Sequence, residues 1–206
     1  MILYCASTNP GKLREFNLIA EHYAAGQLEV RAVPGLAAIA APEETGDSFA
    51  ANASLKADYY SRLCDGLLFA DDSGLAVDSL GGAPGIFSAR FAGEHATDQQ
   101  NNERVVREAA PFPDRTAHFI CAIAVARRGS TVQVFEDRVT GRLLDSPQGP
   151  NGFGYDPLFF YEPFGATFGE TPAERKLLVS HRGKAMARMI RWILANGSTV
   201  EGTLGQ

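Results

Sequence analysis

Two adjacent aspartates follow a short apolar run, and this stretch constrains the fold more than any other. Residues 67–70 are typical of a buried strand, and Asp71 and Asp72 come directly after them. Because side chains alternate along a strand, we expect the two carboxylates to point to opposite sides. Ser73 and Gly74 then predict a tight turn. One carboxylate could face a cleft and bind Mg²⁺ or accept a proton from water, while the other bonds backbone amides. An Asx turn that leaves a strand would explain the same residues without any chemistry.

Composition restricts the class of protein. The chain has 206 residues, of which 45% are hydrophobic, so we expect one folding unit with a sizeable core. A net charge of −5 argues against sequence-independent binding to nucleic acid and against an anionic membrane surface. The three cysteines lack the spacing of a zinc site or a disulfide framework, and no apolar run is long enough for a signal peptide or a membrane span. These features predict a cytoplasmic protein.

The remaining periodicity predicts several elements. We expect strands at residues 2–6 and 28–32, and a β-hairpin formed by residues 116–126 and 131–140. Helix starts are indicated by Asn9, Ser48 and the capping box of Thr97 with Gln100, and a last helix is predicted from Ser180 to Asn196 and Gly197.

A polar turn links the first strand to the first helix, and its residues are Ser7, Thr8, Asn9, Pro10, Gly11 and Lys12. Asn9 can cap the helix and Pro10 suits its first position. Free backbone N–H groups and the positive end of the helix dipole favour an anion here, and Lys12 adds a full charge. The spacing does not match GxxxxGK[ST], which excludes the usual phosphate-loop NTPase. A capped surface helix without a ligand would explain the same turn.

A second polar segment places carboxylates ahead of a helix. Glu43 and Glu44 precede Ser48, and Ser48, Asn52 and Lys56 then recur at intervals of four. Residues with this spacing share one helical face, which could line a site. Alternatively, Glu43 and Glu44 are acidic residues that simply favour a helix start.

Glycines and aromatic residues alternate near the end of the chain. Gly152 and Gly154 alternate with Phe153 and Tyr155, so we expect the backbone to bend and both aromatic rings to be exposed to a flat partner such as a nucleobase. Stacking contributes about 1 to 3 kcal/mol for any base, so a polar group such as Asp156 would have to discriminate between bases. Packing of the rings onto the core is the alternative.

The last predicted helix begins with cations. His181, Arg182 and Lys184 lie in its first turn, and Lys176 is just upstream. Cations at this end oppose the helix dipole by a few tenths of a kcal/mol each, so an anionic ligand explains them better than stability does. The alternative is a set of solvated charges.

Five segments together resemble the inosine triphosphate pyrophosphatase family, whose bacterial members are dITP/XTP pyrophosphatases. They are the polar turn at 7–12, EETGDSFAANASLKA at 43–57, FADDSGLAVDSLGGAPGIFSARFAG at 69–93, GFGYDPLF at 152–159 and SHRGKA at 180–185. The resemblance implies an α/β fold in which an ITPase-like mixed, twisted sheet has flanking helices and two lobes surround a central cleft. It also implies that residues 1–206 form a single domain and that the protein is a homodimer.

The resemblance implies a reaction and a set of residues. The reaction is Mg²⁺-dependent hydrolysis of ITP, dITP and XTP to the monophosphate and pyrophosphate, which cleanses the nucleotide pool. Asp72 would be the catalytic base and a metal ligand, and Glu43 or Glu44 would complete the metal site. The implied substrate-binding residues are Ser7, Thr8, Asn9, Pro10, Gly11, Lys12, Lys56, Ser73, Phe153, Gly154, Tyr155, Asp156, Lys176, His181 and Arg182.

Two other functions are compatible with the same residues. A nucleotide-binding regulatory module could use them without turnover. A related pyrophosphatase could act on modified pyrimidine nucleotides.

Overall fold

The computed structural model describes residues 1–202, with side chains described for residues 1–196. Within this part of the chain, seven strands form a sheet in the order β2-β1-β3-β4-β5-β6-β7. The strands are β1 (Ile2–Cys5), β2 (Glu29–Ala32), β3 (Leu68–Val77), β4 (Thr116–Arg127), β5 (Ser130–Leu143), β6 (Phe159–Tyr161) and β7 (Ala166–Thr167). β1 is parallel to β2 and β3, whereas β6 is antiparallel to both β5 and β7. This mixed sheet with helices confirms the predicted α/β class.

Of the five described α-helices, all but the fourth begin where the sequence predicts. They are α1 (Pro10–Ala24), α2 (Phe49–Tyr60), α3 (Asp98–Ala109), α4 (Ala173–Leu177) and α5 (His181–Gly202). The side chains of Asn9 and Ser48 accept backbone N–H groups of α1 and α2, and Thr97 and Gln100 form the predicted capping box of α3. The predicted end of the last helix at Asn196 and Gly197 is wrong, because α5 continues past both. Among the described helices, none has the length and apolar character needed to cross a membrane.

The chain divides into two compact units. Unit 1 comprises Met1–Asp72, Ala122–Glu136 and Gly183–Gln206, and unit 2 comprises Ser73–Cys121 and Asp137–Arg182. Strands β3, β4 and β5 each contribute residues to both units. That residues 1–206 act as a single domain stays a prediction.

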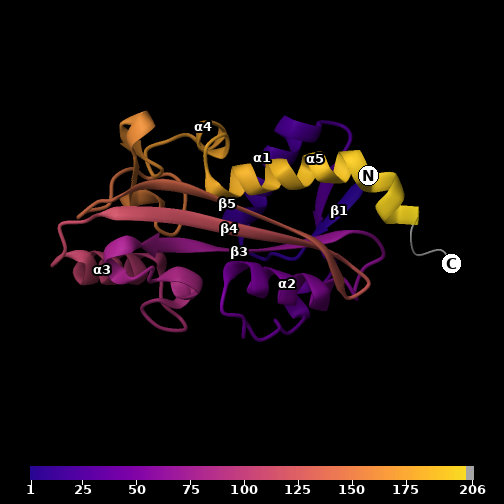
Figure 1. Ribbon diagram of the computed structural model, residues 1–206, viewed down its shortest axis with the longest axis horizontal. Coiled ribbons are helices and arrows are strands. Elements are labelled where there is room, and N and C mark those ends of the chain that lie inside the picture. The colour runs from indigo at the N-terminus through magenta and orange to yellow at the C-terminus, as the bar shows by residue number, and fades with distance from the viewer. Residues whose placement is uncertain (203–206) are drawn as a thin grey trace. The chain divides into compact units, whose positions relative to one another are not determined.

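In unit 1, helices cover the strands from both sides (Figure 1). α1 and α5 lie on one side, and α2 lies on the other. Phe16 of α1 packs edge-on against Phe69 of β3, with ring centroids 5.0 Å apart. Arg191 of α5 lies over the ring of Tyr23 of α1, at 5.5 Å from its centroid. The contact between Phe16 and Phe69 anchors α1 to β3, the strand that carries the two aspartates.

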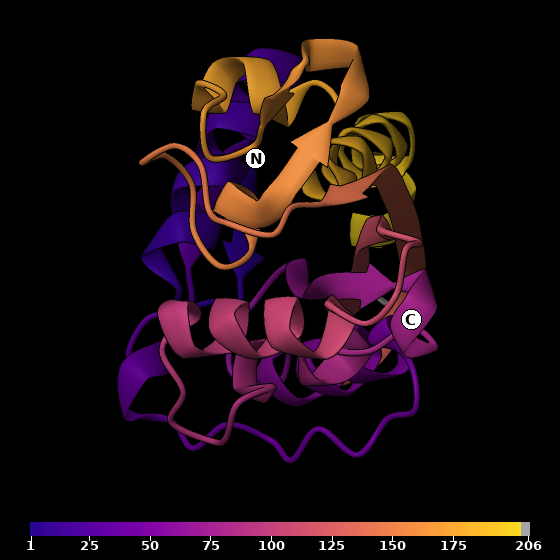
Figure 2. The same ribbon diagram turned by 90° about the vertical axis from the view of Figure 1, so that its left-hand side faces the viewer.

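Unit 2 has its own apolar core. Its fully buried members include Leu75 and Val77 of β3, Val105 of α3, and Phe159 and Phe168. α3 packs beside η2 (Asp78–Leu80) and η3 (Gly85–Arg90), the short helices that follow β3 (Figure 2). In this unit, α3 and the segments that follow β3 therefore pack together over the strands.

Ser73 and Gly74 lie inside β3, so the predicted turn at these residues is wrong. A Cβ atom on Gly74 would lie 2.6 Å from the carbonyl oxygen of Gly85 and would also collide with the Ser88 hydroxyl. A glycine within a strand can mark such a close approach of another backbone. The Ser88 hydroxyl uses this space, since it accepts the N–H of Leu75 at 2.9 Å and donates to the oxygen of Gly85 at 2.6 Å. Gly74 therefore leaves space for the close approach of η3, and the chain does not turn at this residue.

Candidate active site

The parallel pairing of β1 and β3 brings the polar turn close to the two aspartates. Cys5, the last residue of β1, pairs with Phe69, so β3 extends beyond β1 through Asp71 and Asp72. Ligands of such sheets bind outside the carboxyl ends of the strands. Lys12, in the first turn of α1, places its Nζ atom 2.9 Å from Oδ2 of Asp71, whose side chain is almost fully buried. The polar turn and β3 are thus joined by a shielded ion pair.

The capping of α1 changes the predicted anion site. Oδ1 of Asn9 accepts the N–H groups of Gly11 at 2.8 Å and of Lys12 at 3.1 Å. Pro10 has no N–H group, and the N–H of Leu13 bonds to the carbonyl oxygen of Asn9. The N–H groups of Gly11, Lys12 and Leu13 are therefore already bonded within the protein, and the binding of an anion by this turn stays a prediction. The Lys12 ammonium and the hydroxyls before the helix are the groups that could meet a phosphate.

Lys56 of α2 joins two carboxylates. Its Nζ atom lies 2.8 Å from Oδ1 of Asp72 and 2.9 Å from Oε1 of Glu44. Asp72 is only 8% exposed. Glu43 is exposed and Glu44 is half-buried. Of the two glutamates named by the sequence, Glu44 is therefore the one placed near Asp72.

Burial sets the protonation behaviour of this group. Burial raises the pKa of the Asp72 carboxyl, and the neighbouring Lys56 ammonium offsets only part of this effect. Burial also lowers the pKa of Lys56, but Asp72, Asp71 and Glu44 together outweigh it, so the pKa of Lys56 is raised. A carboxylate with a raised pKa accepts protons more readily, which suits a general base.

The acidic residues fit a metal ion only in part. Among the described residues, no group of three or more His, Cys, Asp or Glu side chains could hold a metal ion. Mg²⁺, however, keeps several waters and binds through one or two carboxylates together with substrate phosphates. Glu44 and Asp72 supply two carboxylates that share one lysine. This donor set fits an ion whose coordination is completed by a phosphorylated ligand.

In unit 2, two cations lie against the ring of Phe153. Lys176 Nζ and Arg182 Cζ are each 5.4 Å from the centroid of this ring, which is half-buried. Arg182 also donates to the Ser73 hydroxyl, with Nη2 2.8 Å from Oγ. The structure therefore brings together four of the predicted binding residues, Ser73, Phe153, Lys176 and Arg182.

Tyr155 and Asp156 are occupied within the protein. Tyr155 is 5% exposed, and its hydroxyl donates to the carbonyl oxygen of Ser88 at 2.8 Å. The expectation that both aromatic rings of this loop are exposed is therefore wrong for Tyr155, which packs into the core of unit 2. Asp156 is 2% exposed, accepts the N–H of Phe153 and pairs with Lys176 at 2.6 Å. Both side chains thus hold the loop that carries Phe153.

The cations around the start of α5 are not solvated. Lys176, His181 and Arg182 are each 3% exposed, which contradicts the alternative of a solvated group. The imidazole of His181 stacks on Phe119, with centroids 4.7 Å apart and planes inclined by 12°. Lys176 is paired with Asp156 and Arg182 donates to Ser73, so partners within the protein offset part of the cost of burying these two cations.

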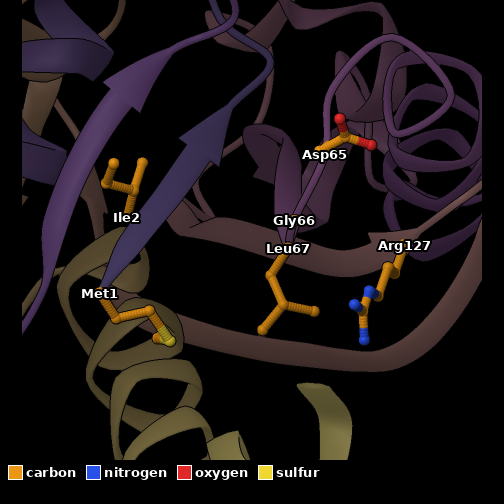
Figure 3. Close-up of a pocket in the computed structure, with 6 residues that line it drawn as sticks. All are labelled: Met1, Ile2, Asp65, Gly66, Leu67 and Arg127. Atoms are coloured by element: carbon orange, nitrogen blue, oxygen red, sulfur yellow. The ribbon is translucent and has the colours of Figure 1, made fainter. Parts of the chain in front are cut away.

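A pocket of about 600 Å³ lies elsewhere in unit 1, at the amino ends of β1 and β3 (Figure 3). It is lined by Met1, Ile2, Asp65, Gly66, Leu67 and Arg127. None of these belongs to the predicted site, and the polar turn follows the opposite end of β1.

The sequence and fold of this chain match one family. The model of the Ham1 family matches residues 3–192. The chain belongs to the Ham1 family. It is 45% identical over 195 residues to the dITP/XTP pyrophosphatase of Acidobacterium capsulatum, covering 90% of this chain and 95% of the relative. The resemblance read from the five sequence segments is confirmed.

Solved structures of Ham1 proteins share the fold. The Ham1 protein of Staphylococcus aureus superposes with a TM-score of 0.81 at 34% identity, covering 96% of this chain and 100% of that one. The nucleoside-triphosphatase / dITP/XTP pyrophosphatase of Mycobacterium abscessus superposes with a TM-score of 0.70 at 36% identity, covering 92% and 97%.

Two residues of this Ham1 chain gain importance from the structure. Asp71 pairs with Lys12, and Asn52 is fully buried beside Asp72. The four-residue spacing of Ser48, Asn52 and Lys56 already placed Asn52 on the relevant face of α2. No sequence signal indicated its partners.

Proposed function

We propose that this Ham1 protein hydrolyses noncanonical purine nucleoside triphosphates, namely ITP, dITP and XTP, to the monophosphate and pyrophosphate. The observation that carries the proposal is the pair of carboxylates formed by half-buried Glu44 and buried Asp72, which are joined through Lys56. This pair occurs in a chain that is 45% identical to a relative named dITP/XTP pyrophosphatase. The reaction removes unwanted nucleotides from the pool.

Asp72 acts as the general base in this proposal. It orients a water molecule for attack on the α-phosphorus and takes a proton from it. Its raised pKa supports this role. Lys12 and Lys56, on either side of the two aspartates, meet the charge that develops on the leaving pyrophosphate. Catalysis then rests mainly on position and electrostatics.

The cofactor in this proposal is Mg²⁺, which Glu44 and Asp72 would hold. When bound, the ion polarises phosphate oxygens and neutralises part of their charge. Glu44 is preferred to Glu43 as the ligand because Glu44 contacts Lys56, the lysine that also contacts Asp72.

The purine base is held by unit 2 in this proposal. Phe153 offers an aromatic face, and Arg182 or His181 donates a hydrogen bond to the 6-oxo group of inosine or xanthosine. Adenine has an amino donor at this position and would leave a buried donor without an acceptor. A site built on a required hydrogen bond can reject the wrong group by about 10⁴-fold. Tyr155 and Asp156 contribute by fixing the loop.

The assembly and location follow from the family resemblance. We propose a homodimer that works in the cytoplasm. The three cysteines, Cys5, Cys64 and Cys121, are free thiols in the structure, which is consistent with a reducing compartment.

Hydrolysis in ¹⁸O-labelled water tests the reaction. With Mg²⁺ and ITP, dITP or XTP, we expect pyrophosphate as a product and the label in the monophosphate, because water attacks the α-phosphorus. ATP, GTP and modified pyrimidine triphosphates serve as the comparison panel. Release of orthophosphate, label in the pyrophosphate or a preference for pyrimidines would contradict the proposal, and tight binding without turnover would favour a regulatory module.

A further inference from the structure

Asn52 connects the segment that carries Glu44 to the strand that carries Asp72. Its side chain is 0% exposed. Oδ1 accepts the backbone N–H of Gly46 at 2.8 Å, and Nδ2 donates to Oδ2 of Asp72 at 3.5 Å. Gly46 is two residues from Glu44 in the chain. One amide group thus contacts both acidic parts of the proposed site.

The two ends of this amide cannot exchange roles. A backbone N–H group can only donate, so the oxygen of Asn52 must face Gly46. The nitrogen then has to face Asp72, which accepts hydrogen bonds when it is ionised. The contact with Gly46 therefore fixes a donor toward the carboxylate.

The close approach of the segment to α2 depends on glycine. A Cβ atom on Gly46 would lie 2.6 Å from Oδ1 of Asn52 and 2.8 Å from Cβ of Ala51. Any larger residue would push the segment away and lengthen the hydrogen bond to Asn52. Gly46 and Asn52 thus form a matched pair that sets how near Glu44 lies to α2 and Lys56.

The two oxygens of Asp72 have different partners. Oδ1 is held by Lys56, and Oδ2 receives the weaker donor from Asn52. With one donor on each oxygen, rotation of the carboxylate is restricted. A base must keep one lone pair aimed at its water, so this restriction has a catalytic use.

We propose that Asn52 is a positioning residue that fixes the orientation of the Asp72 carboxylate and, through Gly46, its spacing from Glu44. This inference rests on the proposed function, because it assigns Asn52 a role in that reaction through Asp72. Asn52 itself touches neither water nor substrate in this account.

The test compares Asn52→Ala with Asn101→Ala. Asn101 is a matched control in unit 2, since it is 4% exposed, accepts the N–H of Ala92 at 2.7 Å and donates to the oxygen of Ala89 at 3.2 Å. Both variants lose a buried amide of the same kind, but only one amide contacts Asp72. The first measurement is kcat and KM for ITP at saturating Mg²⁺.

Loss of the donor from Asn52 lets the Asp72 carboxylate rotate, so kcat should fall while KM for ITP stays near the parent value. We expect kcat to fall by about tenfold for Asn52→Ala, as the loss of one hydrogen bond that orients the base predicts, and not to change for Asn101→Ala. Equal kcat values in the two variants, or a higher KM without a lower kcat, would overturn the inference. If Asn52→Ala does not fold, Asn52→Ser replaces it, because serine is polar and uncharged but too short to donate to Asp72.

A second measurement does not depend on turnover. Urea unfolding of the metal-free protein gives a double-mutant cycle for Asn52→Ala with Asp72→Asn, and a control cycle for Asn101→Ala with Asp72→Asn. We expect coupling in the first cycle and additivity in the second. Additivity in both cycles would overturn the inference even if ITP is not a substrate. Failure of the proposed function is recognised separately, because the parent protein and Asn101→Ala would then release no pyrophosphate from ITP.

Discussion

Lys56 holds Asp72 by an ion pair in which Nζ lies 2.8 Å from Oδ1, with side chains only 15% and 11% exposed. The same ammonium reaches Glu44, so one lysine serves two carboxylates. Charges buried in this way stabilise the fold only while their partners are present. The arrangement therefore links the stability of unit 1 to the groups proposed for catalysis.

Replacement of Lys56 by methionine tests this link. Lys56→Met keeps the aliphatic stem but leaves two carboxylates facing each other. We expect the free energy of unfolding to fall by about 3 kcal/mol, the lower end of the range for breaking a buried pair. Urea denaturation measures it, with Arg14→Met, which replaces an exposed cation of α1, as the control. An equal, small decrease in the free energy of unfolding of both variants would contradict the account.

The pH dependence of stability follows from the burial of Asp72. Its pKa is raised in the folded chain, so the folded state holds the proton more tightly than the unfolded state does. The associated stability is fully present below the unfolded pKa of about 3.9 and is lost as the pH rises through the folded value. Relative to Asp72→Asn, we therefore expect the parent protein to lose stability as the pH rises above about 4. Urea unfolding of both proteins at several pH values checks this. The prediction is disproved if the difference in the free energy of unfolding between the parent and Asp72→Asn stays constant, or if the parent gains stability relative to the variant, as the pH rises.

The hydroxyl of Tyr155 should matter for stability and not for the reaction, because the buried ring is enough to hold the loop of Phe153. Tyr155→Phe keeps the ring but removes the donor to the buried oxygen of Ser88. We expect the free energy of unfolding, measured in urea, to fall by about 1 to 3 kcal/mol, with kcat/KM for ITP unchanged. Tyr59→Phe, at an exposed position, is the control. A lower kcat/KM with unchanged stability would place Tyr155 at the substrate instead.

Arg182 should control the choice between inosine and adenine. It lies against Phe153 and donates to Ser73, which aims its guanidinium within unit 2. We expect Arg182→Ala to lose most of a preference for ITP over ATP of about 10⁴-fold. Steady-state kinetics with both nucleotides measure the ratio of kcat/KM values. An unchanged ratio would assign the discrimination to another donor.

Local sequence signals predicted the parts of the fold that depend on local interactions. Asn9, Ser48 and Thr97 cap helices as expected, because a capping side chain bonds to backbone a few residues away. The end of α5 was predicted wrongly at Asn196 and Gly197. A glycine in a helix costs only about 1 kcal/mol, so it does not by itself end one.

Contacts between distant segments could not be predicted. Gly74 resembled a turn residue, but its role is set by Gly85 and Ser88. Tyr155 resembled an exposed stacking residue, but its hydroxyl has a partner 67 residues away in the chain. Local patterns nevertheless pointed to the two aspartates and to the polar helical face of Lys56, and the family resemblance singled out Asp72, whose role stays a prediction.

The most direct test of the account is pyrophosphate release from ITP by Asp72→Asn. This variant keeps the shape of the side chain but removes the base. With Mg²⁺ present, we expect kcat to fall by at least about 10²-fold, as loss of a general base does, while the protein stays folded. Asp65→Asn, an exposed carboxylate of unit 1, should retain the parent rate. A near-normal rate for Asp72→Asn would contradict the account.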